Sequence, residues 1–143
     1  HYKGLFGRAE ALTLKGKRVR LMLIKNPLGA SQVLTVVAQD PNRRVFIAIN
    51  DNAADGKDVS WLWDAPFEQL VDEAHPITIS GQRAHDMALR LKYAGLKEQL
   101  LLVEPELIQA FYSAVEQTPP ECTLYVLPTY TALLALSAVL KTR

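Results

Sequence analysis

Five consecutive apolar residues, Val45–Ile49, run directly into a loop rich in Asn, Asp and Gly, and this junction limits the folds open to the chain. An unbroken apolar run of this length is typical of a strand buried on both faces of a sheet. Asn, Asp and Gly favour turns, so the loop starts at the carboxyl end of that strand. Ligands of open α/β sheets bind at that end. The junction therefore predicts a central strand with a candidate site at its exit.

The rest of the chain alternates between strand-like and helix-like patterns. Two short strands around a turn at Gly16 predict a hairpin within residues 12–24. Further strands are predicted at 77–81, 100–103 and 123–127, and helices at 31–38, 66–70, 83–94, 106–117 and 130–141. This alternation favours parallel pairing through crossover helices. We expect an α/β, Rossmann-like, mostly parallel sheet with helices on both faces, entered through an N-terminal β-hairpin.

Bulk properties exclude several classes of protein. A chain of 143 residues that is 49% hydrophobic is the size of one compact domain. A formal net charge of +1 indicates neither nucleic acid nor an anionic membrane as a partner. The longest apolar runs, 21–24 and 132–140, are too short to span a bilayer. The start at His1 without Met or a signal-peptide pattern indicates a fragment of a longer chain.

Outside the acidic loop the sequence offers little chemistry. It has no Walker A loop, no Gly-x-Gly-x-x-Gly turn and no Gly-x-Ser-x-Gly elbow. Cys122 is interpreted as a buried structural thiol, and His75 and His85 as surface or capping residues without a catalytic partner. A single cysteine and the lack of a Cys/His cluster argue against structural zinc and fit a reducing cytoplasm. One helical face carries three charged residues, Arg83, Asp86 and Arg90. The last two are four residues apart, which predicts an exposed ion pair that contributes little.

The acidic loop itself holds three carboxylates, Asp51, Asp55 and Asp58. A carboxylate at a strand end can orient and stabilise an imidazolium, or accept a hydrogen bond from an ammonium group. The alternative is that these side chains only close turns and cap helices. Composition alone leaves both interpretations open.

Two flanking features extend the candidate site. Trp61 and Trp63 alternate as they would on a strand, so one is expected in the core and the other exposed, at an interface; burial of both is the alternative. Lys25 and Asn26 follow the first buried strand, which places them at the same edge of the sheet as the acidic loop.

Four stretches of the chain are similar to a known family: residues 25–29, 50–64, 80–95 and 127–132. The second contains Asp-Asn-x-x-Asp-Gly-x-Asp-x-Ser-Trp-x-Trp-Asp, a long and specific pattern. The chain resembles the C-terminal domain of MurT-type Mur ligase-like proteins over nearly its whole length. The resemblance implies a single Mur ligase C-terminal-like domain, residues 1–143, from a longer chain that also contains a central ATPase domain.

The function that this resemblance implies belongs to a complex. It is lipid II isoglutaminyl synthase, a cytoplasmic carbon–nitrogen ligase of peptidoglycan biosynthesis that amidates the α-carboxyl of the stem-peptide glutamate. In that family the central domain uses ATP and Mg to activate the carboxylate of lipid II as an acyl phosphate. A GatD-type glutaminase partner, with a Cys and a His, releases the ammonia. The isolated C-terminal domain is expected to be inactive and to hold no cofactor.

The role implied for the C-terminal domain is to dock the glutaminase and to supply the acidic residue of a Cys-His-Asp triad. Asp55 ranks first because it lies beyond the strand end and can project outward. Asp51, which is nearer the sheet and can hold the loop, and Asp58 rank next. Contacts to the partner or substrate are expected from the residues around them, Lys25, Asn26, Asn52, Trp61, Trp63 and Arg83. Two other functions stay open: a non-catalytic interaction domain, and a small-ligand-binding α/β module that uses the clustered acids for a divalent cation.

Overall fold

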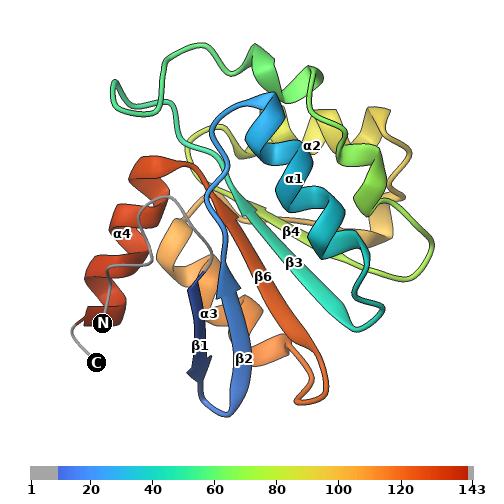
Figure 1. The fold of residues 1–143 in the computed structure, drawn as a ribbon, viewed down its shortest axis with the longest axis vertical. Helices are drawn as coiled ribbons and strands as arrows, with labels where there is room; N and C mark the ends of the chain where they lie inside the picture. The colour runs from blue at the N-terminus through green and yellow to red at the C-terminus, as the bar shows by residue number, and fades with distance from the viewer. Residues whose placement is uncertain (1–9, 142–143) are drawn as a thin grey trace.

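The computed structural model describes residues 10–141, and its centre is one six-stranded sheet (Figure 1). The strands are β1 Glu10–Leu14, β2 Lys17–Leu21, β3 Arg43–Ala48, β4 Ile77–Ser80, β5 Leu101–Val103 and β6 Thr123–Pro128. Their order in the sheet is β1-β2-β6-β3-β4-β5. Strands β2, β6, β3, β4 and β5 are parallel, and β1 pairs antiparallel with β2. The predicted mostly parallel sheet with an N-terminal hairpin is confirmed.

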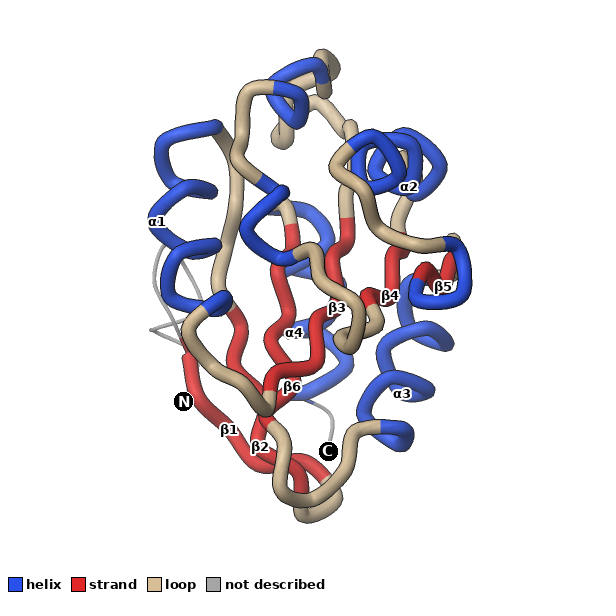
Figure 2. The backbone as a smooth tube through the Cα atoms, turned by 90° about the vertical axis from the view of Figure 1, so that its right-hand side faces the viewer, coloured by secondary structure: helices blue, strands red, loops and turns tan. Residues whose placement is uncertain are grey.

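Helices cover both faces of this sheet (Figures 1 and 2). They are α1 Pro27–Ala38, α2 Ala84–Tyr93, α3 Leu107–Gln117 and α4 Tyr130–Lys141, with short 3-10 helices η2 Ser60–Trp63, η3 Phe67–Leu70 and η4 Glu98–Leu100. Because side chains alternate along a strand, β3 divides the core in two. Val45 and Ile47 face α1 and α2, whereas Phe46 and Ala48 face α3 and α4.

The local sequence explains the element boundaries. The hairpin turns on Lys15 and Gly16, whose φ angles of 51° and 78° fit the two-residue turn that matches strand twist. Helix α1 begins at Pro27, four residues before the predicted start, because Asn26 caps it by accepting a hydrogen bond from the Gly29 N–H at 2.8 Å. Residues 60–63 form a 3-10 helix, so the strand-like alternation expected of the two tryptophans there was wrong.

The order of the strands places the ends of β3 and β6 side by side, at a crevice lined by residues that follow β2, β3 and β6. The chain that leaves β3 continues into η2 and η3, which pack on the face of α1 and α2 through Leu62 and Phe67. The chain that leaves β6 enters α4, which packs on the opposite face through Leu133 and Leu136. Connections that leave neighbouring strands toward opposite faces define a topological switch point, the usual ligand site of such sheets.

Gly81 lets the exits of β3 and β4 lie close together. Its φ angle is 98°, and a Cβ at this position would lie 2.5 Å from the carbonyl oxygen of Ile49. Only glycine fits so near a neighbouring backbone in this conformation. The loop after β4 therefore reaches the acidic loop after β3.

At the amino ends of the strands, opposite the crevice, His75 is part of a polar cluster rather than an isolated surface residue. Its Nδ1 lies 2.6 Å from Oδ2 of Asp72, and its Nε2 lies 2.8 Å from the carbonyl oxygen of Pro41. The same Asp72 oxygen accepts a hydrogen bond from Nη2 of Arg43 at 3.0 Å. The cluster joins the segments that precede β3 and β4, so it is a structural brace far from the crevice.

Asp72 makes this brace dependent on pH. Partial burial raises its pKa, but hydrogen bonds from the Ala74 N–H, the His75 ring and the His75 N–H outweigh burial and lower the pKa from 3.8 to about 2. A carboxyl with a lowered folded-state pKa stabilises the protein above about pH 4, and that contribution is lost as the pH falls toward 2.

We expect Asp72→Asn to lower the free energy of unfolding at pH 7 by about 1 kcal/mol, after allowance for solvent screening of a side chain that is 38% exposed. Between pH 4 and pH 2 the variant should lose less stability than the wild type. Urea titrations at several pH values measure both effects. Asp64→Asn, at an exposed position, is the matched control. Parallel pH profiles for wild type and Asp72→Asn would contradict the prediction.

Candidate functional site

Residues 50–59 cross the carboxyl ends of the strands at the switch point and are tied to the start of α4 (Figure 1). The Asn50 N–H donates to Oγ1 of Thr129 at 2.9 Å. The side-chain amides of Asn50 and Asn52 both donate to Oγ1 of Thr131, at 3.1 and 3.0 Å. Loop and helix therefore form one polar unit across the crevice.

Asp55 is the centre of that unit. Its Oδ1 accepts a hydrogen bond from the Thr131 N–H at 2.8 Å, and its Oδ2 accepts one from the Thr131 hydroxyl at 2.5 Å. Oδ2 also accepts from the Asn52 N–H at 3.1 Å. A carboxylate has about four acceptor positions. Three are filled by these bonds, so one position on Oδ1 is left for an incoming donor.

A hollow of about 480 Å³ opens beside Asp55. Its walls come from the ends of β2 and β6, the loop after β3 and the first residue of α4. The lining residues are Leu23, Lys25, Asn26, Ala54, Asp55, Thr129 and Tyr130. The structure thus brings Lys25 and Asn26 next to Asp55, as expected from their position at strand ends. A side chain of another molecule has room to reach the carboxylate here.

Asp51, unlike Asp55, forms an ion pair, with Arg83 at the start of α2. Nη1 of Arg83 lies 2.9 Å from Oδ2 of Asp51, and Nε lies 2.6 Å from Oδ2 of Asp86. Hydrogen bonds to Asp86 and Asp51 raise the pKa of Arg83, and the bond from Arg83 lowers the pKa of Asp86. The side chain of Gln82 adds two bonds to the loop, accepting from the Asp51 N–H at 2.9 Å and donating to Oδ1 of Asn52 at 3.0 Å. Asp51 therefore fastens the loop to α2.

Asp58 is exposed at the far side of the loop. Its Oδ1 accepts a hydrogen bond from the Ser60 N–H at 2.9 Å. This bond and the Ser60 hydroxyl lower the pKa of Asp58. Asp58 lines a second hollow, of about 280 Å³, together with Trp63 and Arg83. It does not reach the hollow beside Asp55.

The two tryptophans divide as expected between core and surface. Trp61 packs against the core on the face of α1 and α2. Trp63 is 45% exposed and meets the ring of Tyr93 edge to face, with centroids 5.4 Å apart. Tyr93 is itself 75% exposed. Leu89, four residues before Tyr93 on α2, is also exposed, and we call these three side chains the Trp63 patch.

Arg90 corrects the prediction of an exposed ion pair with Asp86. Its side chain is 5% exposed, and its guanidinium lies under the Trp63 ring, 5.5 Å from the centroid. Nε donates to the carbonyl oxygen of Leu62 at 2.8 Å, and Nη2 donates to that of Ala65 at 2.7 Å. Both terminal nitrogens also bind the carboxylate of Glu68, at 3.0 and 2.9 Å. The residue therefore fastens η2, η3 and the turn between them to α2, because the fork of a guanidinium can bind several acceptors at once.

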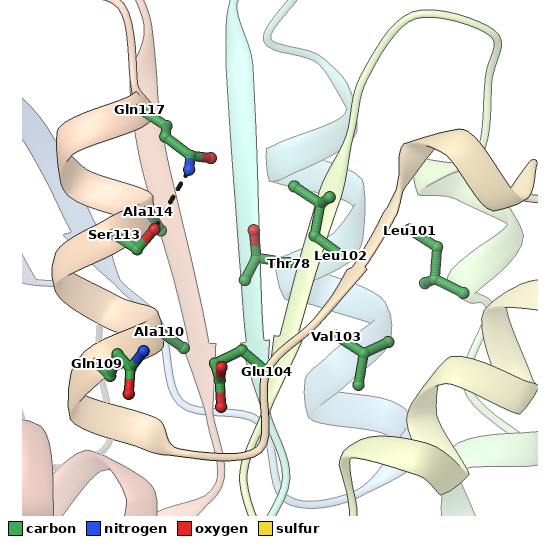
Figure 3. A pocket seen from close by; sticks show the side chains of 10 residues that line it. All are labelled: Thr78, Leu101, Leu102, Val103, Glu104, Gln109, Ala110, Ser113, Ala114 and Gln117. Atoms are coloured by element: carbon green, nitrogen blue, oxygen red, sulfur yellow. Dashed lines mark hydrogen bonds between the residues drawn. The ribbon is translucent and has the colours of Figure 1, made fainter.

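Another hollow, of about 320 Å³, lies between α3 and β5 (Figure 3). Polar side chains of α3, Gln109, Ser113 and Gln117, stand opposite the exposed Leu102. The single carboxylate in its lining, Glu104, accepts a hydrogen bond from the Glu106 N–H at 3.0 Å. The lining has no histidine and no second carboxylate that could work together with Glu104 or Ser113, so we place the candidate site at the crevice.

Three further observations concern the described residues, 10–141. Cys122 is half-buried just before β6, so the prediction of a buried thiol was wrong. Within that part of the chain, no three His, Cys, Asp or Glu side chains gather as a metal-binding group. None of its helices has the length and apolar character needed to cross a membrane.

Sequence reasoning missed the residues that hold the acidic loop, chiefly Thr129, Thr131 and Gln82. They come from the segments that follow β6 and β4, up to 81 residues away in sequence. Hydroxyl and amide side chains directly after strands were the available signal, since the exits of neighbouring parallel strands meet at one edge.

The chain is similar to one protein family and to curated proteins that share one name. Residues 23–133 match the family described as MurT ligase C-terminal. The chain is 35% identical over 144 residues to the lipid II isoglutaminyl synthase (glutamine-hydrolyzing) subunit MurT of Streptococcus pneumoniae, covering 99% of this chain and 32% of that protein. It is 35% identical over 129 residues to the subunit of the same name from Staphylococcus aureus, covering 89% and 29%. The chain thus spans about a third of the length of these relatives.

Proposed function

Since the chain belongs to the MurT ligase C-terminal family, we propose that it is the C-terminal domain of the ligase subunit of a lipid II isoglutaminyl synthase. The whole subunit uses ATP and glutamine-derived ammonia to amidate the stem-peptide glutamate of lipid II in the cytoplasm. ATP and Mg²⁺ act outside residues 1–143. This domain docks a GatD-type glutaminase and supplies Asp55 to its Cys-His site.

The observation that carries the proposal is the state of the Asp55 carboxylate. Three hydrogen bonds from Thr131 and Asn52 hold it, and one acceptor position on Oδ1 is left beside an open hollow. The aspartate of a catalytic triad needs this combination, because it must be fixed in place and still accept an N–H from the histidine. Asp51 is already paired with Arg83, and Asp58 lies outside the hollow.

The chemistry follows from this placement. The partner's thiolate attacks the amide carbon of glutamine, the C–N bond breaks, and the imidazolium gives its proton to the departing ammonia. Asp55 accepts a hydrogen bond from the other nitrogen of that ring, which keeps the ring oriented and stabilises its positive charge. Water then hydrolyses the thioester to glutamate. The carboxylate stays ionised throughout and forms no covalent bond.

The direct test is reconstitution. The complete subunit, copurified with a GatD-type glutaminase, should release ammonia from glutamine, and the glutaminase alone should be nearly inactive. Replacing Asp51, Asp55 and Asp58 one at a time by Asn identifies the contributing carboxylate. Full activity in all three variants would refute the triad proposal.

A second candidate, a docking domain without a catalytic residue, is favoured by the Trp63 patch alone. Exposed aromatic side chains over a fixed cation are common centres of protein interfaces. Under this alternative, substitutions in the patch abolish binding, whereas aspartate substitutions leave turnover intact.

We expect Trp63→Ala to weaken binding of the glutaminase by about tenfold or more, because the ring contributes a large rigid contact area. Isothermal titration calorimetry gives the dissociation constant, and ammonia release at saturating partner should stay near the wild-type rate. Leu28→Ala removes an apolar side chain that is 73% exposed on α1 and is the matched control. An unchanged dissociation constant for Trp63→Ala would place the docking surface elsewhere.

A further inference from the structure

Thr131 contacts both oxygens of the Asp55 carboxylate. Its backbone N–H binds Oδ1 at 2.8 Å, and its hydroxyl binds Oδ2 at 2.5 Å. As the second residue of α4, it presents an N–H that has no partner within the helix. One residue thus fixes both the position and the rotation of the carboxylate.

The hydroxyl of Thr131 has only one direction in which to donate. A hydroxyl carries one donor and two acceptor positions. The side-chain amides of Asn50 and Asn52 donate to it at 3.1 and 3.0 Å and so occupy both acceptor positions. The remaining proton points at Asp55. Asn50 and Asn52 are held in turn, since their Oδ1 atoms accept hydrogen bonds from the backbone N–H and side-chain amide of Gln82, both at 3.0 Å.

We propose that Thr131 is a positioning residue that holds the Asp55 carboxylate in the orientation needed to accept the partner's imidazole N–H, with Asn50 and Asn52 directing its hydroxyl. This inference rests on the proposed function of Asp55. Thr131 itself contacts neither glutamine nor the partner's cysteine. Its hydroxyl acts on turnover by keeping the free acceptor position of Oδ1 aimed into the hollow.

Thr131→Val, which keeps the side-chain shape and the backbone N–H, tests the inference in the complete subunit bound to its glutaminase. We expect the kcat for ammonia release to fall about 10- to 100-fold. The KM for glutamine and the dissociation constant of the complex should stay within about twofold, because neither depends on the hydroxyl. Thr131→Ser restores the hydroxyl and should recover most of the wild-type kcat. Thr35→Val removes an exposed hydroxyl on α1 and is the matched control.

The outcomes separate this inference from the proposed function. If Asp55→Asn abolishes turnover and Thr131→Val leaves kcat unchanged, the positioning role is refuted and the triad role stands. If Asp55→Asn has no effect, the triad role itself fails. A lower melting temperature of Thr131→Val with normal kcat in the purified complex would reduce Thr131 to a helix-capping residue. Should Thr131→Val not fold, Asn52→Ala takes its place, since it removes one of the amides that direct the hydroxyl; an unchanged kcat for Asn52→Ala would then refute the positioning role.

Discussion

Asp55→Asn in the complete subunit is expected to lower the kcat of glutaminase turnover by about 10³-fold or more, with little change in docking. An amide in place of the carboxylate presents an N–H₂ group or a neutral oxygen to the imidazole, so it no longer stabilises the ring's positive charge. The Thr131 hydroxyl and N–H, which donate to both oxygens, cannot both be satisfied by an amide. Single-turnover and steady-state ammonia assays measure the loss.

Two isosteric variants from the same loop are the controls for that result. Asp51→Asn breaks the ion pair with Arg83 and should lower kcat only several-fold, by loosening the loop. Asp58→Asn, at an exposed position, should leave kcat within about twofold. A loss of activity in Asp51→Asn or Asp58→Asn equal to that in Asp55→Asn would contradict the assignment of the triad to Asp55. Calorimetry with the glutaminase must give similar dissociation constants for all three variants.

The fold followed from the sequence because its signals are local. The apolar run of β3, the glycines after α2 and at the hairpin turn, and the helical spacing in α3 each depend on residues a few positions apart. The errors in the predicted elements arose at the cap of α1 and at the short 3-10 helix η2. The first helix was predicted to begin at residue 31, although Pro27 begins α1, because proline at the first helical position and proline after a strand look alike in sequence.

The candidate site was only half visible in the sequence because its contacts are distant. The sequence showed the acidic loop as a cluster of carboxylates. The order of these residues along the chain did not indicate which side chains bind them. Asp55 meets Thr131 across 76 residues, and this pairing arises only because β6 inserts between β2 and β3. The same insertion creates the hollow that Asp55 lines. Strand order is a long-range property, which a single sequence does not encode in any local pattern.

The crevice also indicates why the domain holds its carboxylate so firmly. A site shared between two proteins assembles only when they bind. Each side chain that becomes ordered at that moment costs conformational entropy, which lowers the affinity of the complex. Asp55, Thr131, Asn50 and Asn52 are already bonded to one another in this chain. If the proposed function holds, the partner's imidazole therefore meets a carboxylate that is already held in place. The entropy cost of binding then comes from side chains of the docking surface.

Arg90→Met is expected to lower the free energy of unfolding by about 3 kcal/mol, equivalent to a fall in melting temperature of roughly 10 °C. Methionine fills the space beneath Trp63 but leaves the carbonyl oxygen of Leu62 without its donor and that of Ala65 with the Phe67 N–H alone. Glu68 contributes less, because its side chain is 58% exposed and regains water.

Three variants separate the roles of Arg90, and urea and thermal denaturation measure each of them. Arg90→Lys keeps the charge but not the forked geometry, so it should lose about 2 kcal/mol. Glu68→Gln should lose less than about 1 kcal/mol. Arg83→Met, at the residue directly before α2 and with a side chain 32% exposed, is the matched control and should also lose less than about 1 kcal/mol. A loss below about 0.5 kcal/mol in Arg90→Met would mean that η2 and η3 are held by their apolar contacts alone. Binding of the glutaminase should fall together with stability in Arg90→Met, since the guanidinium supports the ring of Trp63 on which docking is proposed to depend.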